Sequence, residues 1–173
     1  MKTLLRSALT LSILAAASIA PAASPVVRPA PDFTFDGTAA KRSLRSLRGQ
    51  PVVLLIARSP KDSAFRKQLK LLTSIYAEYA SRGTVFVAAF SEKDGEVLSN
   101  IPFIVAANGP RVAAEYGQRE DLLVAIIGRD GNLDYSTHQV LPAFRIREII
   151  QNNYDVQTAS RRIIPNIPPE QGR

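Results

Sequence analysis

Four polar residues near the middle of the chain have side chains of the types that carry chemistry: Arg58, Ser59, Lys61 and Asp62. A serine hydroxyl beside a lysine and an aspartate can serve a hydrolase or a transferase, provided that a base removes the hydroxyl proton. Arg58 and Lys61, with Arg66 close by, can also hold a small anion at the start of a helix. Asp62 partly cancels their positive field, so anion binding is the weaker of these hypotheses.

The same residues also have a purely structural interpretation. Ser59 can cap the N-terminus of a helix, and Pro60 suits the first helical position because its missing N–H would be unpaired there anyway. Asp62, three residues after this cap, can return a hydrogen bond and complement the helix dipole. The pattern therefore indicates a helix start, and we assign no catalytic residue to it.

Composition removes most other chemistries. The 173 residues include no cysteine, which excludes disulfides, thiolate metal sites and thiol redox reactions. The one histidine, His138, follows no GxSxG nucleophile motif and is interpreted as an exposed loop residue. Asp130 and Asp134 show no metal-ligand spacing, and there is no Walker or GxGxxG phosphate loop. The sequence therefore predicts neither a metal nor a cofactor, and it favours a protein that is not an enzyme.

Two apolar runs and the amphipathic segment between them must position Ser59. Pro51–Ala57 and Thr84–Phe90 are too short to span a membrane and are rich in strand formers. The segment between them predicts one long helix that reaches Arg82 and ends at Gly83. Its apolar stripe consists of Phe65, Leu69, Leu72, Tyr76 and Tyr79. Strand, helix and strand form a βαβ unit with a parallel strand pair, and ligands usually bind where such a strand hands over to its helix.

The flanking segments predict the remaining elements of an α/β domain. Strands are expected at Asp32–Phe35, Ile101–Ala107, Leu122–Ile127 and Asn132–Thr137. Asp130-Gly131 predicts a tight hairpin turn before the last of these strands. A short helix is expected from Pro110 to Tyr116, and a final helix is expected to start at Pro142.

The N-terminus has the three-part pattern of a secretory signal peptide. Lys2 and Arg6 precede an uncharged apolar stretch, Ser7–Ala20, and Ala20-Pro21-Ala22 offers small residues for cleavage near Ala22. The predicted organisation is a signal peptide (1–22), a Pro-rich linker (23–31), one domain (32–154) and a polar, Pro-containing tail (155–173). We therefore expect a secreted or periplasmic protein with no integral membrane segment after cleavage.

Basic residues gather in one short stretch, at Lys41, Arg42, Arg45 and Arg48, which we call the basic patch. A helical turn here would bury Leu44 and Leu47 and expose the four cations. The patch can bind an anion or a membrane surface, but a solvated face is the favoured interpretation because the run is short and has no aromatic residue. The formal charge of +7 is too dispersed to predict a nucleic-acid partner.

Several local strings, in this order, resemble the thioredoxin fold in its branch of peroxiredoxin-like and TlpA-like thiol proteins. They are APDFTFDG with SLRSLRGQPVVLL, then NGPRVAAEYG, then IIGRDGNLDY. The stretch LLIARSPKDSAFRKQLKLL is also similar to a poorly characterised group of secreted thioredoxin-like domains. The resemblance spans about Ala30 to Ile150 and implies a three-layer sandwich, with helices on a central mixed sheet of about 4–5 strands.

The chain departs from this family at the residues that carry its activity. The resemblance implies a nucleophilic cysteine in the turn Arg58–Ser63 and a cis-proline at the position of Leu122, and neither is present. A cis peptide before leucine would cost about 2.5–4 kcal/mol, so we expect a trans bond there. The residues that would form the altered site, as weak binding candidates, are Arg58, Ser59, Lys61, Asp62, Asp121 and Leu122.

The sequence thus predicts a redox-inactive thioredoxin-like domain that binds a protein partner, of unknown identity, in the cell envelope or outside the cell. Two alternatives stay open. One is an enzyme of non-thiol chemistry that uses Ser59, Lys61 and Asp62. The other is a binder of anions or membrane surfaces that uses the basic patch, Lys41–Arg48.

Overall fold

The computed structural model describes residues 28–93 and 95–152 of the chain. The predicted signal peptide (1–22), residues 23–27 of the predicted linker and the predicted tail (155–173) lie outside the described residues. No helix within the described part of the chain is long and apolar enough to cross a membrane.

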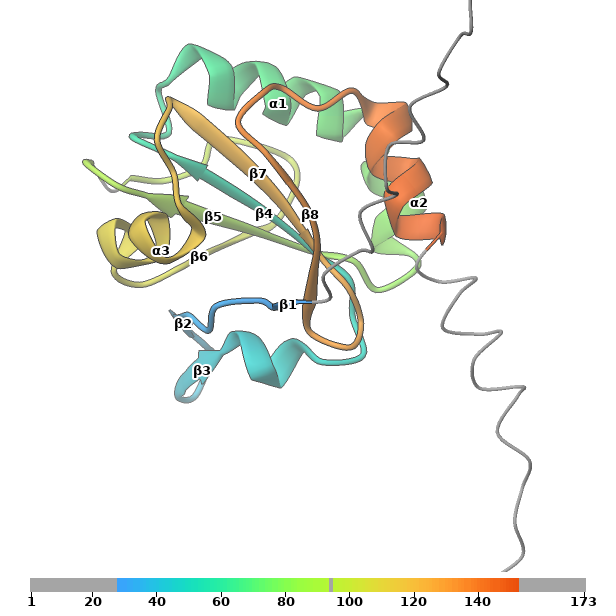
Figure 1. Ribbon diagram of the computed structural model, residues 1–173, viewed down its shortest axis with the longest axis horizontal. Helices are drawn as coiled ribbons and strands as arrows, with labels where there is room; N and C mark the ends of the chain where they lie inside the picture. Colours follow the sequence, from blue (N-terminus) through green and yellow to red (C-terminus); the bar gives the residue numbers. More distant parts are fainter. Residues whose placement is uncertain (1–27, 94, 153–173) are drawn as a thin grey trace, which may run out of the picture.

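A mixed sheet of six strands forms the centre of the described structure, with helices on both faces (Figure 1). Its spatial order is β1 (Arg28–Pro29), β8 (Asn132–Thr137), β7 (Leu122–Ile127), β4 (Val52–Ala57), β5 (Val85–Phe90) and β6 (Phe103–Val105). Strands β4, β5 and β6 are parallel to one another, whereas β7, β8 and β1 join antiparallel. The three-layer fold expected from the sequence is confirmed, and β1 adds an edge strand within the predicted linker.

A separate two-stranded hairpin, β2 (Thr34–Asp36) and β3 (Lys41–Ser43), lies between β1 and β4 in the chain. It leads into a short 3₁₀ helix, η1 (Leu44–Leu47). Leu44 and Leu47 are buried while the four cations of the basic patch are exposed, as the leucine spacing predicts.

The helices divide into two layers. Figure 1 shows α1 (Ser63–Thr73) and the orange helix of residues 143–152 on one side of the sheet, with α3 (Gly109–Tyr116), η1 and the β2–β3 hairpin on the other. Each side has its own apolar core. The α1 cluster includes Phe65, Leu72, Tyr79, Ile146 and Ile150. The α3 cluster includes Phe33, Phe35, Leu44, Leu47 and Tyr116.

The predicted long helix is interrupted, which corrects the expectation of one helix reaching Arg82. It divides into α1 and α2 (Tyr76–Ala80), with Ser74 and Ile75 between them. The Ser74 hydroxyl donates to the Leu71 carbonyl at 2.7 Å, and the Ser74 amide bonds the same carbonyl. Serine side chains that bond nearby carbonyls compete with the helical ladder. The tighter turn brings Ile75 into the α1 cluster together with Tyr79.

Strand β8 carries a bulge that lets it serve both cores. Ile127 pairs with Leu133 and Ile126 with Tyr135, so Asp134 is the extra residue. Without a bulge, residues two apart on a strand would share a face. Here Leu133 packs against the α3 cluster and Tyr135 packs against the α1 cluster.

A buried tyrosine of α3 bonds the segment between β1 and β2, which we call the N-terminal arm. The Tyr116 hydroxyl donates to the Pro31 carbonyl at 2.8 Å. Burial raises the pKa of Tyr116 above its usual value, and the nearby carboxylates of Asp32 and Glu115 add to this effect. The hydroxyl therefore keeps its proton, and with it the hydrogen bond to the arm, well above neutral pH.

A buried glutamine joins α1 to the segment before the last helix. The Gln68 side chain is fully buried, its Nε2 donates to the Leu141 carbonyl at 3.0 Å, and its Oε1 accepts from the Leu141 amide at 2.6 Å. Both backbone groups of Leu141 are thus satisfied without water. This pair holds residues 141–150 over the α1 cluster.

Replacing Gln68→Ala removes both hydrogen bonds and leaves the buried polar groups of Leu141 unpaired. We expect a loss of about 2–4 kcal/mol in the free energy of unfolding. Urea denaturation followed by circular dichroism measures it. The exposed neighbour variant Lys67→Ala should stay within about 0.5 kcal/mol of the unchanged protein. Equal stabilities of the two variants would contradict the role given to Gln68.

Candidate functional site

The residues singled out at the strand–helix junction lie in a turn that precedes α1. The helix begins at Ser63 with Asp62 in the N-cap position, so the prediction that Ser59 caps the helix and Pro60 starts it is wrong. The Asp62 amide donates to the Ser59 carbonyl at 3.3 Å, which closes a β-turn over Ser59–Asp62. The chain completes this turn first, and the helical ladder starts only with the Arg66 amide, which bonds the Asp62 carbonyl.

The Asp62 carboxylate holds the turn together. Its Oδ2 accepts from the backbone amides of Arg58 at 3.1 Å and Ser59 at 3.2 Å, and its Oδ1 accepts from the Ser59 hydroxyl at 3.0 Å. The side chain caps no amide of α1 and turns back toward β4 instead. The returned hydrogen bond from Asp62 to Ser59 expected from the sequence is therefore present, but it stabilises the turn and not a helix that begins at Pro60.

Ser59 is occupied within the same turn. Its hydroxyl donates to Asp62 and accepts from the Lys61 amide at 3.3 Å. His138, which is half-buried and not fully exposed as predicted, has its Nε2 at 3.1 Å from the Gly117 carbonyl. The geometry shows no imidazole bonded to the Ser59 hydroxyl, which would be needed to activate it as in a serine hydrolase.

Arg58 connects the turn to the start of β7. Its Nη2 lies 3.0 Å from Asp121 Oδ1, and its Nε lies 3.8 Å from Asp62 Oδ2. Leu122, next in the chain, pairs with Ala57 at the end of β4. The structure thus brings the six predicted residues of this site together, although Leu122 has only 1% of its surface exposed and offers no side chain to a ligand.

Two neighbours of this site were not expected from the sequence. The Gln118 side-chain amide donates to the Glu120 carbonyl at 3.1 Å and to the Ile56 carbonyl at 3.5 Å, which positions the loop that carries Asp121. Gly95 lies against Pro60, because a Cβ on this glycine would be 2.9 Å from Pro60 Cγ. No local pattern marks the Gln118–Ile56 or the Gly95–Pro60 contact, because each joins residues that are distant in the chain.

The site contains no arrangement suited to a metal. Across residues 28–93 and 95–152 there is no group of three or more His, Asp or Glu side chains that could bind one. Asp130, considered above, accepts from the Asn132 amide at 3.0 Å and from its side-chain nitrogen at 2.7 Å within the hairpin turn. All peptide bonds of the described residues are trans, including the one before Leu122.

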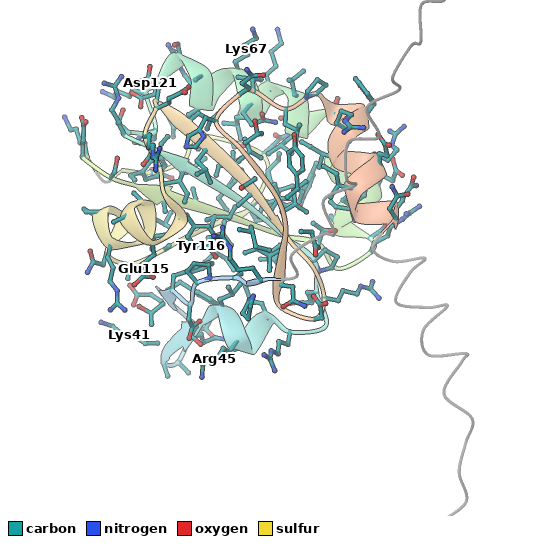
Figure 2. All side chains as sticks on the ribbon, in the orientation of Figure 1. Lys41, Arg45, Lys67, Glu115, Tyr116 and Asp121 are labelled. Carbon is teal, nitrogen blue, oxygen red and sulfur yellow. The ribbon has the colours of Figure 1, made fainter. Side chains whose placement is uncertain are left out.

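The basic patch forms a second candidate surface. Arg45 Nε lies 3.3 Å from Asp32 Oδ2, and Arg42 Nε donates to the Ser46 hydroxyl at 3.2 Å. Lys41 stands opposite Asp36 in the β2–β3 pair. Figure 2 shows Lys41 and Arg45 at the opposite end of the molecule from Asp121, so the patch and the turn are separate surfaces.

Removal of the carboxylate by Asp62→Ala should open the turn. Three hydrogen bonds to a charged acceptor are lost, so we expect the free energy of unfolding to fall by about 1–3 kcal/mol. Asp121→Ala, which breaks only an exposed ion pair, should cost less than about 1 kcal/mol. Parallel urea titrations of the two variants provide the measurement. A larger loss for Asp121→Ala would show that the turn does not depend on Asp62.

Several solved thiol proteins resemble this structure. A candidate thiol:disulfide interchange protein DsbE from Chlorobium tepidum has a TM-score of 0.60 and 20% identity, over 73% of this chain and 96% of that protein. The thioredoxin domain of a thiol-disulfide oxidoreductase from Bacteroides vulgatus has a TM-score of 0.57 and 15% identity, over 73% and 96%. Thioredoxin peroxidase I from Plasmodium yoelii has a TM-score of 0.57 and 14% identity, over 85% and 98%.

No protein-family model matches the sequence, and no curated protein does. Because the three identities are 20% or lower, the likeness establishes the fold and nothing finer. The chain therefore has a thioredoxin-like fold, and it has no cysteine with which to carry out the thiol chemistry named for these neighbours.

Proposed function

We propose that this chain is a binding protein of the cell envelope or the extracellular space, built on a thioredoxin-like fold and without thiol chemistry. One observation carries the proposal. The junction of β4 and α1, where the family resemblance implies a reactive cysteine, is a turn closed by Asp62 on the amides of Arg58 and Ser59. The Ser59 hydroxyl is bonded to the same carboxylate, so the turn offers a fixed polar surface in place of a reactive thiol.

The surface around this turn is polar and partly exposed, which suits contact with another protein. Arg58 and Asp121 form an ion pair whose side chains keep 47% and 62% of their surface exposed. Lys61 is exposed beside them. Charged groups that are held in place but still reach solvent give an interface its orientation and its specificity more than its affinity.

A partner that binds this surface should be sensitive to the sign of its charges. The unchanged protein, immobilised on a support, should retain a reproducible partner from an envelope fraction, identified by mass spectrometry. We expect Lys61→Glu to weaken capture at least roughly tenfold, because like charges placed across an interface are repulsive. Lys41→Glu, at the other end of the molecule, should leave capture unchanged.

Two outcomes would contradict this proposal. The first is that no partner is recovered while the protein turns over a peroxide or a disulfide substrate. The second is that Lys41→Glu weakens capture as much as Lys61→Glu does, which would point to general charge attraction and not to the turn.

The enzyme alternative, which uses Ser59, Lys61 and Asp62, stays a prediction. Under it, Ser59→Ala would abolish a hydrolase or transferase activity and leave stability near that of the unchanged protein. The hydrogen bonds of the Ser59 hydroxyl within the turn favour the opposite result, a loss of stability of about 0.5–2 kcal/mol with no activity to lose.

A second candidate function is binding to anionic surfaces through the basic patch. The observation that favours it is that all four cations of the basic patch are exposed. Within residues 28–93 and 95–152, Arg45 is the one of the four that forms an ion pair, with Asp32. Short basic stretches of this kind attract anionic lipids over about one Debye length.

Flotation with vesicles tests the patch directly. Binding to anionic vesicles should weaken steeply with salt, because the Debye length falls from about 10 Å at 0.1 M to about 3 Å at 1 M. The double variant Lys41→Glu with Arg48→Glu should lose this binding, whereas Lys61→Glu should keep it. Binding that is absent, or that does not respond to salt, would remove this candidate.

A further inference from the structure

The solvent side of α1 carries charges of one sign only. Arg66, Lys67 and Lys70 are exposed, and the sequence of the helix, SAFRKQLKLLT, contains no aspartate or glutamate. With 3.6 residues per turn, the three side chains fall within about 100° of one another around the helix axis. They lie opposite the side that α1 buries in the core. We call these three residues the cationic face of α1.

No carboxylate in the described part of the chain neutralises the cationic face, because none forms an ion pair with any of its three side chains. Asp62, the carboxylate nearest to it along the chain, turns back to the amides of Arg58 and Ser59. Asp121 pairs with Arg58. The three positive charges are therefore open to a partner.

Helix formation does not account for these charges, because their positions oppose it. Acidic side chains near the N-terminus stabilise a helix, and α1 has none in its first turn. Arg66 and Lys70 are four residues apart, a spacing at which like charges repel each other on a helix. A mixture of both signs would keep this face solvated with less repulsion, so the single sign favours a role in binding.

We propose that the cationic face of α1 binds an acidic segment of a protein partner. This inference rests on the proposed function, because Lys67 lies at the same end of the molecule as Asp121 of the turn surface (Figure 2). Carboxylates placed against the three cations give the charge complementarity that selects a partner. The helix that carries the cations is held on its buried side by the bonds between Gln68 and Leu141.

The exposed side chains of α1 distinguish this partner from a membrane and from a nucleic acid. Apart from the three cations they are Ser63 and Thr73. A helix that lies on a membrane inserts apolar side chains, and α1 exposes none. Single-stranded nucleic acids stack on aromatic side chains, and the aromatic residue of α1, Phe65, is buried. An acidic protein segment needs only the charges that are present.

A short fluorescent peptide of alternating glutamate and serine is the probe, and its anisotropy with the purified chain measures binding. The triple variant Arg66→Gln, Lys67→Gln and Lys70→Gln removes the cationic face. We expect it to weaken binding of the peptide at least roughly tenfold, because three attractive charges are lost. A peptide of alternating glutamine and serine should not bind to the unchanged protein.

The matched control removes the same number of charges from the basic patch, through Lys41→Gln, Arg42→Gln and Arg48→Gln. It should leave the affinity for the glutamate peptide unchanged. Equal weakening by the two triple variants would overturn the proposal, because attraction would then follow net charge alone. Absence of binding to the glutamate peptide would overturn it as well.

Two further probes test the other classes of partner. These are vesicles of phosphatidylcholine with phosphatidylserine, and single-stranded oligothymidylate. If removal of the cationic face abolishes binding to one of them and leaves the affinity for the glutamate peptide unchanged, the face belongs to a lipid surface or to a nucleic acid, and the proposal is rejected.

Urea denaturation separates lost binding from lost structure. The midpoint of the variant without the cationic face should not fall, because the change removes like-charge repulsion. The single variant Arg66→Lys, which keeps the charge, should bind the peptide like the unchanged protein. A lower midpoint in the triple variant would show that the three cations support the fold, and this would contradict the proposal.

The partner retained from an envelope fraction distinguishes a failure of this inference from a failure of the proposed function. Capture that Lys61→Glu weakens, but that survives removal of the cationic face, would keep the proposed function and reject this inference. Recovery of no partner, together with a glutamate peptide that binds through the cationic face, would reject the proposed function and keep the binding of acidic segments.

Discussion

Burial of β4 on both of its faces is the constraint on which the other elements depend. All six of its residues are buried, and both of its edges are bonded, to β5 on one side and to β7 on the other. Alternate residues supply the two cores, with Val53 and Leu55 in the α1 cluster and Val52 and Leu54 in the α3 cluster. A strand with this environment needs a helical layer on each face, so the sandwich follows from it.

At the end of β4 the turn over Ser59–Asp62 satisfies backbone amides that the sheet leaves unpaired. Where the strand leaves the sheet, the amides of Arg58 and Ser59 no longer have ladder partners, and unpaired backbone groups are costly. One carboxylate accepts from both amides, and the Arg58 side chain then reaches Asp121 at the start of β7. In this chain the strand–helix junction therefore connects the end of β4 to the start of the neighbouring strand β7.

The features predicted from the sequence share a local physical cause. Continuous apolar runs at Pro51–Ala57 and Leu122–Ile127 predicted buried strands because only strands covered on both faces need no polar alternation. The turn at Asp130-Gly131 was predicted because Gly131 can take the positive φ of 84° that it shows here. The break at Ser74 was missed because periodicity continues across it, and the competing hydroxyl–carbonyl bond leaves no trace in the spacing.

In the candidate site, too, some features follow from the local sequence and others depend on tertiary packing. The residue types at Arg58–Asp62, and the absence of cysteine, by themselves determined that thiol chemistry is missing and that Asp62 would bond back to Ser59. Only the tertiary structure decided that Asp62 closes a turn before the helix, that Asp121 pairs with Arg58, and that Gln68 holds Leu141. Hydrogen bonds between residues a few positions apart depend on the local sequence, so they can be predicted from residue types and spacing. The pairings with Asp121 and Leu141 join residues more than sixty positions apart along the printed sequence, and they exist only because β4, β7 and α1 pack against one another.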